Sequence, residues 1–206
     1  MYLPKQFEQP DIEVMHALIR SKPLATLVTL NAGGIEANHI PLVLSADPKP
    51  YGALCGHVAR SNPLWQDHPQ DSDVLMIFHG AESYITPSWY ASKTESGKVV
   101  PTWNYVSVQA KGKLRAIHDP GWILSQLESL TAHNEAEFAH PWAVADAPHE
   151  FTGKLLEAIV GIEIVITELK GKWKVSQNRS NQDRSSVANG LNSHGRYEMA
   201  ELVKPN

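Results

Sequence analysis

The chain has 206 residues, of which 42% are hydrophobic and 19% are charged, and this composition excludes a largely disordered protein. Its formal net charge is −4, whereas a protein that binds DNA through the phosphates usually presents a basic face. The only cysteine, Cys55, cannot form an internal disulfide, and no run of about eighteen apolar residues is present. We therefore expect a cytoplasmic protein that crosses no membrane, and direct DNA binding is disfavoured.

Alternating helix and strand patterns begin close to the N-terminus. Apolar residues at helical spacing after Pro10 predict a helix over residues 10–20. Two β-type runs at residues 24–30 and 35–44 flank a turn with two glycines, which predicts a hairpin. Further strands are expected at residues 51–58, 74–79, 83–86, 102–117 and 162–167, with a further short one at 172–175. The clearest of them alternates apolar and polar side chains from Val106 onward, as a strand with one solvated face does.

Helices are expected between and after these strands. Asp119 and Pro120 supply the N-cap and first-turn proline of one helix, which should bury its apolar residues Trp122, Ile123, Leu127 and Leu130. A second helix contains Leu155, Leu156 and Ile159, and a short final helix covers residues 182–191, followed by a loose tail from about residue 192. Without repeats or linkers, residues 1–206 are expected to form a single domain. Its class is α+β, mainly β: an antiparallel, Greek-key-like barrel with peripheral helices.

Two segments carry groups suited to ligand binding. In the first, Gly56–Trp65, a strand ends and a helix is expected to begin with Asn62 as its cap, which places Arg60 and Ser61 where an anion is favoured. The second combines Tyr84–Tyr90 with Val100–Tyr105, and its aromatic rings and polar groups could form the wall of a site for a flat ring system. A capped helix with a surface arginine and a structural aromatic cluster are the alternatives.

No catalytic or metal-binding motif is recognisable. The ten histidines lack metal-site spacing, no carboxylates form an evident acid–base pair, and neither a nucleophile elbow nor a dinucleotide fingerprint is present. Catalytic residues therefore stay unassigned and no metal ligand is expected.

Several motifs together resemble a known family. Met1–Phe7, Ala37–Pro41, Gly56–Trp65, Phe78–Gly80, Tyr84–Tyr90, Val100–Tyr105 and Lys174–Arg179 are similar, in this order, to motifs of the PaiB-type FMN-binding negative transcriptional regulators. The resemblance covers nearly the whole chain. It implies a flavin-reductase-like split β-barrel and a homodimer that binds FMN at or near the subunit interface.

The resemblance also implies roles for individual residues. The FMN phosphate is expected near Arg60, Ser61 and Asn62, with His57 and Asn38 toward the ring and Trp89, Trp103 and Asn104 closing over it. Thr102 belongs to the same motif, and Lys93 matches the family's position only loosely, so its contact with phosphate is left open.

Three functions follow as alternatives. The first is a dimeric flavin-binding regulator or sensor that acts through a protein partner or a small molecule. The second is an FMN-dependent oxidoreductase acting on a small molecule or on flavin, in which the cofactor carries the chemistry. The third and weakest is a haem-binding or haem-degrading split barrel. Fold alone does not choose among them.

Overall fold

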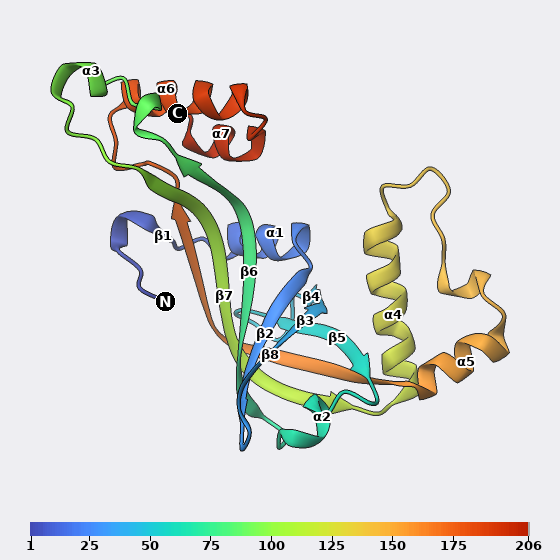
Figure 1. Ribbon diagram of the computed structural model, residues 1–206. Coiled ribbons are helices and arrows are strands. Elements are labelled where there is room, and N and C mark those ends of the chain that lie inside the picture. Colours follow the sequence, from blue (N-terminus) through green and yellow to red (C-terminus); the bar gives the residue numbers. More distant parts are fainter. Residues whose placement is uncertain (206) are drawn as a thin grey trace. The chain divides into compact units, whose positions relative to one another are not determined.

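The computed structural model describes residues 1–205, and the eight strands of these residues form one sheet. The strand order is β3-β2-β6-β7-β8-β5-β4, and β1 pairs with β8 (Figure 1). The five pairs β1–β8, β2–β3, β2–β6, β4–β5 and β5–β8 are antiparallel. The strands are β1 Glu8–Gln9, β2 Leu24–Asn31, β3 Gly34–Pro41, β4 Val43–Ser45, β5 Ala53–Ala59, β6 Ser72–Ile85, β7 Thr102–Ile117 and β8 Ile159–Lys174.

Helices lie between and after the strands. The α-helices are α1 Ile12–Ser21, α2 Leu64–Asp67, α3 Lys93–Ser96, α4 Pro120–Glu135, α5 His149–Glu157, α6 Asn181–Ser193 and α7 Tyr197–Val203. Short 3-10 turns occur at η1 Lys5–Phe7, η2 Pro87–Trp89 and η3 Val144–Asp146. In the described part of the chain, every helix is too short or too polar to cross a membrane. The α+β, mainly β class expected from the sequence is confirmed.

Local sequence accounts for the best-predicted elements. The predicted hairpin is β2 and β3, and the side chain of Asn31 accepts a 2.8 Å bond from the N–H of Gly33 while Gly34 adopts a positive φ of 117°. Strand β7 has the predicted bounds because its alternating side chains suit a half-buried sheet surface. Helix α4 begins as expected, with the Asp119 carboxylate accepting a bond from the N–H of Trp122. Of its four predicted buried residues, Ile123 is buried and the other three are half-buried.

Five expectations need correction. Ile159, expected in one helix with Leu155 and Leu156, is the first residue of β8, because α5 ends at Glu157. The two short strands predicted at 74–79 and 83–86 are one strand, β6, and those at 162–167 and 172–175 are one strand, β8. The second run of the hairpin is divided into β3 and β4 around Leu42, whose N–H bonds to the carbonyl of Pro23. The loose tail expected from about residue 192 instead contains α7, whose Met199, Ala200 and Val203 are buried.

The chain divides into two compact units. One comprises residues 1–15, 79–108 and 170 to the end of the described chain, and the other comprises residues 16–78 and 109–169. Strands β6, β7 and β8 contribute residues to both. We refer to the first as the C-terminal-helix unit and to the second as the hairpin unit. The prediction of a single domain concerns independent folding and stays a prediction.

The hairpin unit has an aliphatic core between its strands. Leu27 of β2, Leu54 of β5, Met76 of β6 and Ile162 of β8 are fully buried. Strand β5 pairs with β8 from Ala53↔Val165 to Ala59↔Ile159, and α4 packs against β5. This register places His57 of β5 opposite Gly161 of β8, and the side chain of His57 contacts Gln126 of α4.

The core of the C-terminal-helix unit depends on the last two helices. Helices α6 and α7 pack closely against each other, burying Val187, Leu191 and Met199 (Figure 1). The guanidinium of Arg184 donates to the carbonyls of Val203 at 2.9 Å and Lys204 at 2.8 Å. These bonds satisfy carbonyls at the end of α7, which have no partner within their own helix.

Candidate functional site

Asn38, Ser61 and Asn62 lie together in the hairpin unit. They line an open groove of about 460 Å³ with Glu36, Ala37 and Pro63. The Nδ2 group of Asn62 donates to Oδ1 of Asn38 at 3.0 Å, which ties the segment after β5 to the edge strand β3. Three of the residues predicted for phosphate and ring binding are therefore neighbours, although they are up to 24 positions apart in the sequence.

The turn after β5 presents hydrogen-bond donors to this groove. The side chain of Asn62 accepts a 2.9 Å bond from the N–H of Leu64, and Pro63, rather than Asn62, is the N-cap of α2. Since α2 has only four residues, its dipole contributes little to anion binding. Among the described residues, neither the hydroxyl nor the main-chain N–H of Ser61 has a hydrogen-bond partner. Both donors are available to a ligand.

Arg60 makes contacts that its sequence position did not indicate. Its Nε donates to the carbonyl of Glu157 at 2.6 Å, and its Nη2 donates to the carbonyl of Ile159 at 2.8 Å. Its own carbonyl accepts a 3.0 Å bond from the indole of Trp65. The guanidinium is thus fixed beside the end of α5, and its Nη1 group makes no bond to the described residues. Arg60 is not among the residues that line the groove, so the structure does not support the phosphate contact expected for its guanidinium.

His57 lies on the face of β5 that α4 covers. Its Nδ1 is 2.9 Å from Oε1 of Gln126 on α4. The backbone of His57 pairs with Gly161 of β8. Gln126 was not identified from the sequence, because a polar residue on a helix gives no sign of the strand that it will contact.

Aromatic residues line a pocket in the C-terminal-helix unit. The rings of Tyr84 and Trp103 meet edge to face with centroids 6.0 Å apart, and the ring of Trp89 lies 5.2 Å from that of His194. The pocket has a volume of about 340 Å³, and its lining residues are Glu82, Ser83, Tyr84, Trp89, Trp103, His194 and Arg196. The structure thus brings together two of the predicted ring-covering residues, Trp89 and Trp103. Trp103 is 55% exposed.

The other three predicted residues of this unit make internal contacts. The amide of Asn104, which is 1% exposed, donates to Oγ of Ser176 at 2.8 Å. Thr102 accepts a bond from Nζ of Lys174, and Nζ of Lys93 donates to Oγ of Ser88 at 3.2 Å. Burial lowers the pKa of Lys174. These contacts organise the aromatic segment, and Asn104 also supports a residue, Ser176, that adopts a positive φ.

His194 and Arg196 are pocket residues that the sequence did not reveal. They lie between α6 and α7, in the part of the chain expected to be a loose tail. Only the packing of the two helices brings them to the aromatic segment, so no local signal could have identified them.

The groove beside Ser61 has the chemistry that a phosphate ester requires. Phosphate oxygens only accept hydrogen bonds, and the Ser61 hydroxyl and N–H and the side-chain amides of Asn38 and Asn62 are donors. Arg60 does not line this groove, and Glu36, which does, opposes an anion. Within residues 1–205 we find no cluster of three or more His, Cys, Asp or Glu that could hold a metal ion. The residues present therefore fit the phosphate of FMN.

Comparison with known proteins gives the family. The family model described as "Putative FMN-binding domain" matches residues 1–168. An uncharacterized protein of Emericella nidulans is 34% identical, and the alignment covers 95% of this chain and 92% of that protein. The Bacillus subtilis protease synthase and sporulation protein PAI 2 is 29% identical over 99% of this chain and 97% of its own length.

Solved structures show the fold. The FAD and heme binding protein from Mycobacterium smegmatis superimposes with a TM-score of 0.60 at 16% identity, covering 81% of this chain and 73% of that chain. The flavocytochrome Anf3 from Azotobacter vinelandii gives a TM-score of 0.58 at 16% identity, covering 81% and 69%. The split-barrel fold expected from the resemblance is thereby confirmed. Since the family model matches most of the chain and its relatives align over nearly all of it, the chain belongs to the PaiB-type family of FMN-binding-domain proteins.

Proposed function

We propose that this protein binds FMN with the phosphate in the groove beside Ser61 and acts as a dimeric flavin-binding regulator or sensor. The observation that carries the proposal is Ser61, whose hydroxyl and N–H are both unpartnered among the described residues and face a groove with two side-chain amides. A charge-assisted bond to phosphate is roughly twice as strong as a neutral one, so these donors favour FMN over riboflavin.

The ring of the flavin requires a different set of residues. His57 and Asn38 are proposed to lie toward it in one protomer. Trp89 and Trp103, which line a pocket and are not fully buried, are proposed to cover it from the second protomer. When bound, FMN supplies one- and two-electron redox chemistry, and the protein supplies binding, orientation and exclusion of water.

A regulatory role agrees with the features of the chain. The net charge of −4 disfavours direct DNA binding, so we propose that the protein acts through a protein partner or a small molecule. The Bacillus subtilis relative has a name that refers to sporulation, which supports a regulatory process rather than a metabolic step.

The experiment is a comparison of FMN and riboflavin binding by quenching of flavin fluorescence, using wild type and Ser61→Ala. Wild type should bind FMN more tightly than riboflavin. Ser61→Ala should weaken FMN binding by about tenfold and leave riboflavin binding unchanged, since only the phosphate contact is lost. Ser96→Ala, at an exposed position on α3, is the matched control. Equal affinities for FMN and riboflavin in wild type would refute the phosphate site.

The dimer and the role of the flavin are tested with the same preparation. Sedimentation velocity should give a dimer with and without FMN, and a monomer at all concentrations would exclude flavin covering by a second protomer. Steady NADH or NADPH consumption by the FMN-loaded protein would favour the oxidoreductase. A Soret band after haem addition, with no FMN binding, would favour the haem protein.

A further inference from the structure

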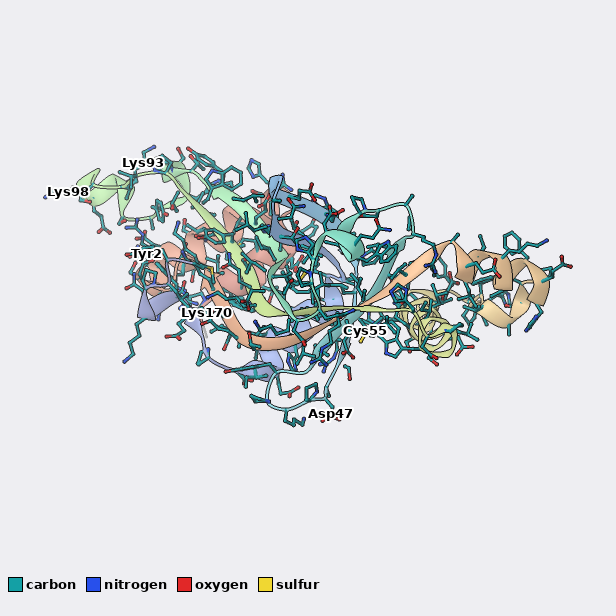
Figure 2. The ribbon with its side chains drawn as sticks, turned by 90° about the horizontal axis from the view of Figure 1, so that it is seen from below. Tyr2, Asp47, Cys55, Lys93, Lys98 and Lys170 are labelled. Atoms are coloured by element: carbon teal, nitrogen blue, oxygen red, sulfur yellow. The ribbon has the colours of Figure 1, made fainter. Side chains whose placement is uncertain are left out.

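Helix α4 presents a mixed face beside strands β4 and β5 of the hairpin unit, with Gln126 buried and Ser125 and Ser129 exposed. Trp122, Ser125, Gln126 and Ser129 follow the spacing i, i+3, i+4, i+7, which places them on one face of the helix. A helix face that only filled a core would carry leucine or isoleucine at most of these positions. Here two serines and a glutamine leave a pocket of about 340 Å³ between α4 and the strands β4 and β5. The strands contribute Val43, Leu44, Ser45 and Cys55, and Figure 2 shows Cys55 beside α4.

The aromatic wall of this pocket has a fixed position. A Cβ atom on Gly161 would lie 2.6 Å from Cζ3 of Trp122, so the indole packs directly on the backbone of β8. Gly161 pairs with His57, whose side chain contacts Gln126 one turn further along α4. The indole and the amide are therefore positioned before any ligand arrives.

Gln126 has an unused hydrogen-bonding group. The residue is 5% exposed, its Oε1 is 2.9 Å from Nδ1 of His57, and its Nε2 has no partner among the described residues. A buried polar group without a partner costs roughly 1–3 kcal/mol. The Nε2 atom is inaccessible to solvent although Gln126 lines the pocket, so a small shift of the side chain would bring this donor to an acceptor atom in the pocket.

The pocket does not suit ions. Its eight lining residues are uncharged, and most of its surface is apolar. Burial first, and then the nearby carboxylate of Glu163, raise the pKa of the Cys55 thiol to about 11, so the thiol stays protonated at neutral pH. The negative potential of Glu163 adds a specific penalty for an anion.

We infer that this α4 pocket is a binding site for a small, uncharged, flat molecule with a hydrogen-bond acceptor such as a carbonyl oxygen. The molecule packs against Trp122 and accepts a bond from Nε2 of Gln126. The pocket volume lies at the lower end of the range of about 300–1,000 Å³ for small-molecule sites, which favours a single substituted ring. None of its lining residues lines the groove beside Ser61, but Gln126 contacts His57, which we propose to lie toward the flavin ring.

Protection of Cys55 from alkylation tests this site, because the chain has only one cysteine. The probes are benzamide, which is flat and uncharged with a carbonyl, benzoate, which is its anionic counterpart, and ethylbenzene, which has no acceptor. Benzamide should slow the reaction of Cys55 with iodoacetamide in a saturable manner and at lower concentration than ethylbenzene. Benzoate should have no effect.

Two variants distinguish a site from non-specific association. Gln126→Met keeps the side-chain length but removes the donor, so it should weaken benzamide protection by about three- to tenfold and leave ethylbenzene protection unchanged. Ser129→Leu, at an exposed position of α4, should fill the pocket and abolish protection by both probes while the fold and the His57–Gln126 contact persist. Gln66→Met, at an exposed position, is the control.

The proposal is overturned if none of the probes protects Cys55 in wild type, which would mean that the pocket holds only water. It is also overturned if benzamide protects wild type and Ser129→Leu equally. If Gln126→Met does not fold, which circular dichroism would reveal, Ser129→Leu and the comparison of the three probes still decide the outcome.

Discussion

The guanidinium of Arg60 lies against the carbonyl of Glu157, with 2.6 Å between Nε and the oxygen, so it joins the end of β5 to the end of α5 across 97 positions of the chain. The second bond, to Ile159, extends this contact to the first residue of β8. Carbonyls in the last turn of a helix have no partner within the helix, and an arginine is a suitable donor for them.

Arg60→Ala should therefore lower the free energy of unfolding even without flavin. We expect a loss of about 1 kcal/mol, because the side chain is exposed and two hydrogen bonds are lost. Urea denaturation of the FMN-free protein measures it. Arg60→Lys keeps the charge and loses the second bond, so it should fall between wild type and Arg60→Ala. An unchanged free energy of unfolding in Arg60→Ala would show that the contact does not stabilise the fold. Any loss of FMN affinity in this variant would then report a lost contact between Arg60 and the FMN phosphate.

Glu36 should weaken FMN binding, because its carboxylate lines the same groove as Ser61. Glu36→Gln should tighten FMN binding by about two- to fivefold at low salt, a range that corresponds to an exposed charge pair. The gain should shrink as salt is added, and riboflavin binding should not change. Flavin fluorescence titrations measure all three effects. Glu137→Gln, also exposed, is the control, and an equal gain there would indicate a general effect of net charge.

Short-range patterns in the sequence predicted most helices and strands, but they did not show that β6 and β8 are each one long strand. The alternation in β7 and the cap at Asp119 are local signals, and the structure follows them. The strands expected at 162–167 and 172–175, by contrast, are continuous in β8, and Gly171 lies between them. A Cβ there would be 2.8 Å from Cζ3 of Trp173 and 2.9 Å from Cγ of Met15, so the glycine permits close packing from α1. Glycine inside a strand often marks such an approach rather than a break.

The candidate site was predictable only where its residues are close together in the sequence. Ser61 and Asn62 belong to one turn, so their proximity followed from the motif. The contacts of Arg60 with Glu157 and of His57 with Gln126 join residues 97 and 69 positions apart, and only the register of β5 on β8 brings them together. Helix α7 was missed because it is short and its N-cap, Arg196, makes no side-chain capping bond.

Gly190 of α6 should be intolerant of a side chain. A Cβ at this position would lie 2.5 Å from Cγ and Cδ2 of Trp89, so the indole packs on the helix backbone. Gly190→Ala should therefore destabilise the protein by about 1–3 kcal/mol, the usual cost of overpacking, and should alter tryptophan fluorescence. Urea denaturation gives the first quantity and emission spectra give the second.

The matched control is Gly153→Ala in α5, where nothing lies within 4 Å of the added Cβ. There the better helix propensity of alanine should stabilise the protein by about 0.5–1 kcal/mol. Opposite signs for the two substitutions are the expected result. Stabilisation by both would mean that Trp89 does not pack on α6 in solution.

Cys55 should make stability depend on pH in the alkaline range. Burial and Glu163 raise its pKa from 9.0 to about 11, so the folded protein retains a proton that the unfolded chain loses. The contribution of this thiol to stability is fully present below pH 9 and is lost as the pH rises from about 9 through about 11. The difference in unfolding free energy between wild type and Cys55→Ala should therefore decrease over this interval, as measured by urea denaturation at pH 8, 9, 10 and 11. A difference that stays constant across these four pH values would mean that the thiol is as solvated in the fold as in the unfolded chain, and that the pocket beside α4 is open to water.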